Sequence, residues 1–187
     1  LLRNDGGRFV DATADHLPGG AHVTQDLAAG DVDGDGDLDL VEGNEDGNRI
    51  LLGDGAGRFA VATDPALRYP ARPGGEETRS VELGDVDGDG DLDLVVANVV
   101  WAGLPGGNRL LLNDGHGRFA DAPAGWLPQE HSNSIDAQPA DLDGDGDLDL
   151  VVANAFAGPN AWRLLLGDGD GAFADATARL LPRPLAG

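Results

Sequence analysis

Three short stretches of the chain concentrate aspartate at alternating positions. Residues 85–93 read DVDGDGDLD, and residues 31–39 and 141–149 repeat this nine-residue pattern with at most one change. Five carboxylates so close together repel one another strongly, so a folded chain keeps them there only where positive charge compensates. A solvated acidic turn is the alternative, but three matching copies favour binding of a hard divalent cation.

Calcium fits this spacing better than magnesium does. Ca²⁺ takes about six to eight oxygens in a flexible shell, whereas Mg²⁺ demands octahedral geometry and releases water reluctantly. By analogy with an EF-hand, positions one, three and five would supply side-chain oxygens and position seven a backbone carbonyl. Position nine would supply the last carboxylate. We predict about three Ca²⁺ ions per chain, bound by Asp31, Asp33, Asp35, Asp37, Asp39, Asp85, Asp87, Asp89, Asp91, Asp93, Asp141, Asp143, Asp145, Asp147 and Asp149.

The composition narrows the classes of partner. Thirty-four acidic residues face 12 basic ones, which gives a formal net charge of −22 and argues against nucleic acid and anionic membranes. There is no cysteine, so neither a disulfide framework nor a thiolate metal site can form. No apolar stretch reaches the roughly 18 residues of a membrane span. Open acidic loops suit the high calcium concentration outside cells, so we expect an extracellular or cell-surface location.

The rest of the chain divides into repeats that must position these loops. A phrase beginning Leu-Leu and ending in Phe occurs at residues 1–9, 51–59, 111–119 and 165–173. The sequence pattern of each repeat predicts four short strands, here called A to D. The aspartate loop joins strand A to strand B, and an Asp-Gly hairpin turn joins strand C to strand D. The chain begins partway through a repeat, lacks a leader segment and reads as a mature or excised piece. No stretch shows helical periodicity.

A repeat of about 40–50 residues with four strands is typical of a β-propeller blade. We therefore predict an all-β fold, a single propeller segment over residues 1–187 with about three and a half four-stranded antiparallel blades. Residues 1–22 would be strands C and D of a preceding blade, and the full blades would be 23–78, 79–131 and 132–187. The ring would be completed by further sequence or by another copy of the chain, because an open ring exposes apolar blade faces.

Several motifs resemble the FG-GAP/VCBS repeats of integrin α-subunit propellers, and especially secreted acidic cartilage-type proteins and their bacterial relatives. These motifs are the aspartate loops followed by Asn44, Asn98 and Asn154, the Asn48-Arg49 and Asn108-Arg109 pairs, and the Leu-Leu-x-Asp-Gly-x-Gly-x-Phe phrases. The resemblance implies a calcium-stabilised extracellular propeller that acts in adhesion or recognition. The third repeat departs from the pattern, with Ala161-Trp162 in place of Gly-Asn.

The strand order separates two ends of each blade. The A–B loops and C–D turns share one end, and the variable B–C and D–A connections share the other. Variable loops on a rigid scaffold often carry binding. Trp101, Trp126 and Tyr69 fall in these connections and Trp162 begins a C strand, so these four aromatics are candidate ligand-binding residues. The alternative is that they bury area at the ends of the core.

These patterns lead to a primary hypothesis and two rivals. The primary hypothesis is a non-enzymatic, calcium-binding repeat protein whose variable face recognises a protein or a glycan. The first rival is a structural protein whose blades close a ring or a polymer between chains. The second is the propeller of a polysaccharide-active enzyme, although the sequence offers no acid/base pair outside the aspartate loops.

Overall fold

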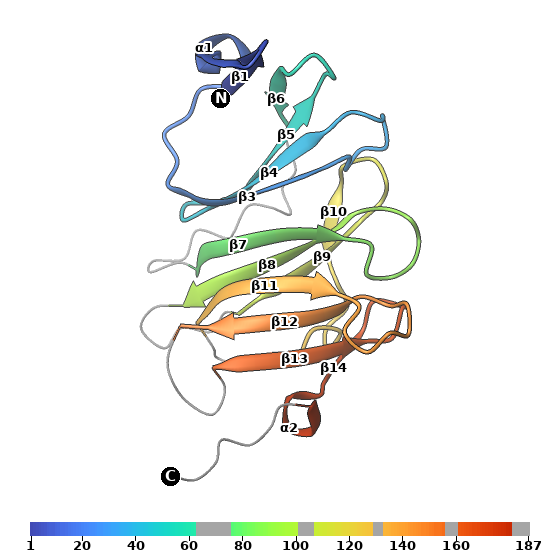
Figure 1. Cartoon of the computed structure of the whole chain (residues 1–187). Coiled ribbons are helices and arrows are strands. Elements are labelled where there is room, and N and C mark those ends of the chain that lie inside the picture. The colour runs from blue at the N-terminus through green and yellow to red at the C-terminus, as the bar shows by residue number, and fades with distance from the viewer. Residues whose placement is uncertain (63–75, 101–106, 129–132, 156–160, 181–187) are drawn as a thin grey trace.

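The protein is built almost entirely of antiparallel β-sheet. The computed structural model describes residues 1–62, 76–100, 107–128, 133–155 and 161–180. Within these ranges a two-stranded sheet and three four-stranded sheets follow each other along the chain. Figure 1 shows the three larger sheets stacked one after another, as in consecutive blades of a propeller. The prediction of a partial β-propeller with about three and a half blades is confirmed.

Each four-stranded sheet is a simple meander. The first sheet consists of β3 (Thr24–Gly30), β4 (Asp39–Asn44), β5 (Arg49–Gly53) and β6 (Phe59–Val61). The second consists of β7 (Glu76–Gly84), β8 (Asp93–Val100), β9 (Arg109–Asn113) and β10 (Phe119–Asp121). The third consists of β11 (Ser134–Ala140), β12 (Asp149–Asn154), β13 (Trp162–Gly167) and β14 (Phe173–Asp175). The two-stranded sheet, here the half-sheet, pairs β1 (Leu2–Asp5) with β2 (Arg8–Asp11).

Two details differ from the sequence-based expectation. The strand β7 begins at Glu76, three residues before the predicted boundary at 78/79, because its partner β8 extends to Val100 and continues the pairing. Two helices of four residues each, α1 (Thr13–His16) and α2 (Thr177–Leu180), follow the outermost strands. Helices this short leave no periodic signal in a sequence.

The core lies between the sheets. Ala28, Val41 and Ile50 of the first sheet pack with Val81, Leu94, Val96 and Leu111 of the second. The opposite face of the second sheet presents Val95, Ala97 and Leu110 to Ala137, Leu150, Val152 and Leu165 of the third. Burial on both faces explains why the middle strands are apolar without alternation, because successive side chains point to opposite faces.

An arginine near the start of each C strand pairs with a carboxylate, but the strand that supplies this carboxylate differs between sheets. Arg109 and Arg163 pair with Asp121 and Asp175 of the outermost strands, at 2.7 and 3.1 Å. In the first sheet Val61 occupies the register position of these aspartates. There Arg49 pairs instead with Glu42 of β4, at 2.6 Å. The ion pair is therefore kept in all three sheets, although its acidic partner moves from the fourth strand to the second.

Candidate metal centres

The aspartate loops join the first two strands of each sheet, as predicted. In the first loop, Asp31 accepts hydrogen bonds from the backbone N–H groups of Gly34 and Gly36, at 2.8 and 2.9 Å. Both glycines have positive φ, 75° and 92°, a region that residues with a Cβ rarely adopt. The first aspartate and the two glycines thus wind the chain into a tight loop that brings later carboxylates back toward it.

The ninth aspartate fixes each loop to its own sheet. Asp93 is fully buried at the start of β8, where its Oδ2 accepts the N–H of Val86 at 3.0 Å and its Oδ1 accepts the N–H of Asn113 at 2.9 Å. Asp39 and Asp149 make the same pair of bonds in the other two sheets. Because one oxygen bonds the loop and the other bonds the third strand, this carboxylate holds a ligand position rigidly.

Positions one, three and nine of each loop converge. One carboxylate oxygen from each of these residues lies within 4.8 Å of the others, which gives the triads Asp31/Asp33/Asp39, Asp85/Asp87/Asp93 and Asp141/Asp143/Asp149. Asp35, Asp89 and Asp145 at position five, and Asp37, Asp91 and Asp147 at position seven, are outside the triads. The structure therefore brings nine of the fifteen predicted carboxylates together.

The side chains at positions five and seven make other contacts. Asp35 accepts the backbone N–H of Asp37 at 2.9 Å, and Asp89 makes the same bond with Asp91. The carboxylate of Asp37 lies against Gly55 in the C–D turn, so close that a Cβ on this glycine would lie 2.4 Å from Oδ1 of Asp37. This contact explains why the turn requires glycine at that position.

The loops hold closely spaced negative charge, and the ninth carboxylate of each loop is buried. Burial raises the pKa of Asp93 to about 6, against its ordinary value of 3.8, even though two backbone N–H groups favour the charged form. Partial loss of solvation in the folded loops, with added repulsion from neighbouring aspartates, also raises the pKa values of Asp33, Asp87, Asp143 and Asp147. A cation at the triad would reverse these shifts, because a positive charge stabilises the ionised carboxylates.

The donor set fits a hard divalent ion. Each triad offers only carboxylate oxygens, the ligands that Ca²⁺ prefers, and leaves room in the shell for backbone carbonyls and water. A bound ion would neutralise charge and lock the loop against its sheet. The third triad is the most open, because Asp141 and Asp143 are exposed whereas their counterparts in the first two loops are half-buried.

The difference in exposure arises from the neighbouring sheets. Gly34 of the first loop lies against the C–D turn of the second sheet, where an added Cβ would lie 3.0 Å from the carbonyl oxygen of Gly115. Gly88 of the second loop lies in the same way against Gly169 of the third sheet, at 3.2 Å. Gly144 of the third loop has nothing within 4 Å of an added Cβ among the described residues.

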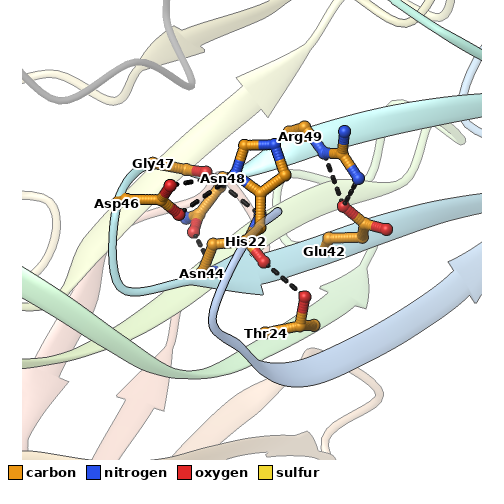
Figure 2. Close-up of polar contacts among 8 residues, drawn as sticks. All are labelled: His22, Thr24, Glu42, Asn44, Asp46, Gly47, Asn48 and Arg49. Carbon is orange, nitrogen blue, oxygen red and sulfur yellow. Dashed lines mark hydrogen bonds and ion pairs between the residues drawn. The ribbon is translucent and has the colours of Figure 1, made fainter. Parts of the chain in front are cut away.

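The opposite end of the first and second sheets is closed by a buried polar network. In the first sheet, shown in Figure 2, Thr24 donates to Asn44 Oδ1, Asn44 Nδ2 donates to the carbonyl oxygen of Gly47, and the N–H of Asn44 donates to Asn48. His22 and Asp46 make a more exposed contact beside it at 3.0 Å. The second sheet repeats the network with Thr78, Asn98, Gly107 and Asn108. The network is structural, since it is satisfied internally in both sheets.

The candidate aromatics fall in different places. Trp126 lies at the same end as the aspartate loops, against Gly171 of the third sheet's C–D turn, and its carbonyl oxygen accepts the N–H of Phe173 at 2.7 Å. The expectation that it lies at the variable end is wrong, because the chain after β10 folds back along the third sheet. Trp162 is 58% exposed at the start of β13, in the position that Asn48 and Asn108 occupy in the other sheets. Trp101 and Tyr69 lie outside the described residues.

Asn113 is a residue that the sequence-based reasoning did not single out. It ends β9 where the first and third sheets have Gly53 and Gly167. Its buried side chain donates to the carbonyl oxygens of Val32 and Leu92. The sequence signal that could have identified this residue is the asparagine itself, because the other two repeats have glycine at the same position.

The stacked four-stranded sheets with their aspartate triads define a repeat protein of the β-propeller class. Residues 31–96, 97–152 and 141–187 match the FG-GAP-like repeat family, so the chain belongs to this family. No curated protein matches the chain. Among the described residues, neither helix approaches the length and apolar composition needed to cross a membrane.

A solved lectin structure has a similar fold. This Agrocybe aegerita lectin, described as recognising non-reducing terminal N-acetylglucosamine, matches with a TM-score of 0.50 and 24% sequence identity. The match covers 78% of this chain but only 36% of the lectin, so the chain spans about a third of that protein's length. At this level of identity the likeness supports the propeller fold and no more.

Proposed function

We propose that the protein is a non-enzymatic, extracellular calcium-binding propeller segment. In this proposal Ca²⁺ at the three aspartate triads stiffens one end of the sheets, and the variable connections at the other end recognise a glycan or a protein. The observation that carries the proposal is the recurrence of an aspartate triad with a buried ninth-position carboxylate at equivalent positions of three sheets. Burial disfavours the ionised aspartates. A calcium ion that compensates their charge would therefore stabilise the folded protein.

A calorimetric calcium titration of chelator-stripped protein tests the metal binding. Saturation near three ions per chain, with a gain of ordered circular dichroism signal, is the expected result. A matched pair of variants tests the ligand set: Asp87→Asn should weaken binding strongly, whereas Asp89→Asn should weaken it little, because Asp89 is outside the triad. A folded chain that binds no calcium would contradict the proposal.

The recognition role has a natural first ligand class. The lectin with the similar fold is described as binding terminal N-acetylglucosamine, so glycans that end in this sugar are the first probes to screen. The screen should be run with calcium and again with chelator, since a rigid scaffold would be needed to present the loops. Binding that requires calcium would support recognition. A blank screen against glycans and extracellular matrix proteins would count against it.

Assembly between chains is the second candidate, and the third sheet favours it. The face of this sheet that points away from the second sheet carries Leu142, Val151, Leu164 and Trp162. Leu142 is 43% exposed, whereas its counterparts Val32 and Val86 are almost completely buried between sheets. An exposed apolar face of this kind is suited to packing against another sheet.

We take a second copy of this chain as the occupant, because the first sheet also presents an exposed apolar side chain, Leu27, on its outer face. Its counterparts Val81 and Ala137 are buried between sheets. Sedimentation measurements with and without calcium should then show concentration-dependent association that Leu164→Asp abolishes. A chain that stays monomeric at all concentrations would exclude assembly.

A further inference from the structure

One buried side chain contacts two of the aspartate loops. Asn113 Nδ2 donates to the carbonyl oxygen of Val32 at 2.8 Å and to that of Leu92 at 3.1 Å, and the N–H of Asn113 donates to Oδ1 of Asp93 at 2.9 Å. Val32 stands between two members of the first triad, and Asp93 is a member of the second. Asn113 therefore bonds directly to the first loop and to a member of the second triad.

A backbone contact reinforces this link. The N–H of Gly117, in the C–D turn of the second sheet, also donates to the carbonyl oxygen of Val32, at 2.8 Å. Both backbone polar groups of Val32 are thus bonded, because its N–H also donates to Asp39 within its own sheet. Movement of the first loop must disturb the second sheet at the residue that holds Asp93.

The second and third loops have no such link among the described residues. The position of Asn113 is taken in the third sheet by Gly167, where an added Cβ would lie 2.2 Å from the carbonyl oxygen of Leu148. A glycine has no side-chain amide to donate to the carbonyl of Val86, the counterpart of Val32. The first loop therefore lies close to the second sheet, and the second loop lies close to the third sheet. Within the described ranges, however, an asparagine bridges only loops 31–39 and 85–93.

Stability alone is a poor explanation for this asparagine. Its Oδ1 is buried and has no hydrogen-bond partner among the described residues. A buried acceptor without a partner costs stability, and the glycine found in the other two sheets avoids that cost. Among the three four-stranded sheets, the amide occurs at this position only where it contacts both loops, which points to a role in linking them.

We propose that Asn113 is a positioning residue that couples calcium binding at loop 31–39 to calcium binding at loop 85–93, whereas loop 141–149 fills independently. This inference rests on the proposed function, since it requires that the loops bind calcium. An ion in the first loop orders Asp31 and Asp33 and thereby fixes Val32 between them. The ordered carbonyl of Val32 holds Asn113, and Asn113 holds Asp93, so the second ion has less ordering to complete.

The coupling must be reciprocal, and this makes it measurable. If calcium in the second loop raises affinity at the first by some factor, calcium in the first raises affinity at the second by the same factor. The amide signals of Gly36, Gly90 and Gly146 report the three loops separately in a nuclear magnetic resonance titration of the full chain with calcium. Loss of the second site by Asp87→Asn should shift the calcium midpoint at Gly36 by about 5-fold or more, a typical coupling.

The decisive comparison removes the amide. Asn113→Ala keeps the Cβ and deletes both Nδ2 hydrogen bonds. In this background Asp87→Asn should leave the midpoint at Gly36 unchanged within about 2-fold, which is the additivity expected of independent sites. Asp143→Asn is the matched control in the third loop, and it should not shift Gly36 in either background. Gly146 serves as an internal reference, because a merely structural defect would move its midpoint as well.

Each outcome has a distinct meaning. An equal shift at Gly36 with and without the amide, or no shift in either background, would overturn the coupling while leaving calcium binding intact. A change at Gly146 caused by Asn113→Ala would assign the residue a structural role and also overturn the proposal. If none of the three glycines responds to calcium, the proposed function itself fails.

Discussion

The second and third sheets have the same strand order but different surroundings. The second sheet is covered on both faces, and its aspartate loop lies against the next C–D turn. The third sheet is covered on one face by the described residues, and its loop is exposed. An aspartate loop and the face beside it are thus completed by the following sheet, so the surroundings of a candidate metal centre depend on the packing between sheets.

The third sheet also departs in sequence at this open side. Ala140 replaces Gly84, which in the second sheet leaves room for Leu148 of its neighbour. Trp162 replaces the asparagine that closes the polar network in the other two sheets, and the N–H of Asn154 bonds the carbonyl oxygen of Ala161 instead. The open face is therefore not a copy of the faces that the first and second sheets present, and a partner must accommodate both changes.

Among these predictions, calcium removal should have the largest effect on stability. It should also distinguish the second aspartate loop from the third. A ligand bound only by the folded state adds about 2.7 kcal/mol per site at a concentration one hundred times its Kd. We expect chelator to lower the melting temperature in calorimetry and to reduce amide protection in all three loops. At limiting calcium, hydrogen exchange should show that the exposed third loop loses protection before the second. Equal loss in both loops would remove the distinction between covered and open sites.

Truncation of a matched leucine should separate the two faces. Leu110 is buried between the second and third sheets, and Leu164 occupies the same position on the open face. We expect Leu110→Ala to reduce the free energy of unfolding by about 2–5 kcal/mol, the usual cost of a core cavity, and Leu164→Ala by less than about half of that. Urea denaturation measures both. Equal costs would mean that the third face is covered in solution.

The pH dependence should change sign with calcium. The pKa of Asp93 in the folded, metal-free chain is about 6, above its ordinary value of 3.8. Its stabilising contribution is therefore fully present below 3.8 and is lost as pH rises through about 6. With calcium bound, acid should instead destabilise the protein, because protons compete with the ion for the carboxylates. Urea titrations at several pH values, with Asp93→Asn as the metal-free control that lacks this transition, measure both effects.

A pair of glycine variants should show the smallest difference. Gly88 and Gly144 both have positive φ, 74° and 84°, so alanine strains the backbone by a similar amount, about 1 kcal/mol, at each position. Of the two, Gly88 alone brings the added Cβ close to a neighbouring sheet, 3.2 Å from the carbonyl oxygen of Gly169. Gly88→Ala should thus lower the melting temperature slightly more than Gly144→Ala. The reverse order would contradict the close approach between these sheets.

The sequence predicted the architecture because the repeat is carried by residues that cannot vary freely. The alternation of aspartate and glycine located all three loops, and the Asp-Gly turns located the C–D hairpins. It could not separate the carboxylates that converge from those that do not, since Asp87 and Asp89 are equivalent in sequence and differ only in where the backbone turns them. The folding back of the chain at Trp126 depends on contacts with a later sheet, which local patterns do not contain.

In the first sheet the acidic partner of the arginine is Glu42 of the second strand. This placement limits which strands can be exchanged between repeats without disturbing the ion pair. Replacing β6 alone with the fourth strand of another repeat would give Arg49 two acidic partners, Glu42 and the incoming aspartate. Replacing β4 alone would remove Glu42 and supply no substitute from the fourth strand, because Val61 carries no charge. Recombination that preserves charge balance must therefore transfer the second, third and fourth strands together, so a three-stranded segment, rather than a hairpin, is the smallest unit that duplication and shuffling can move.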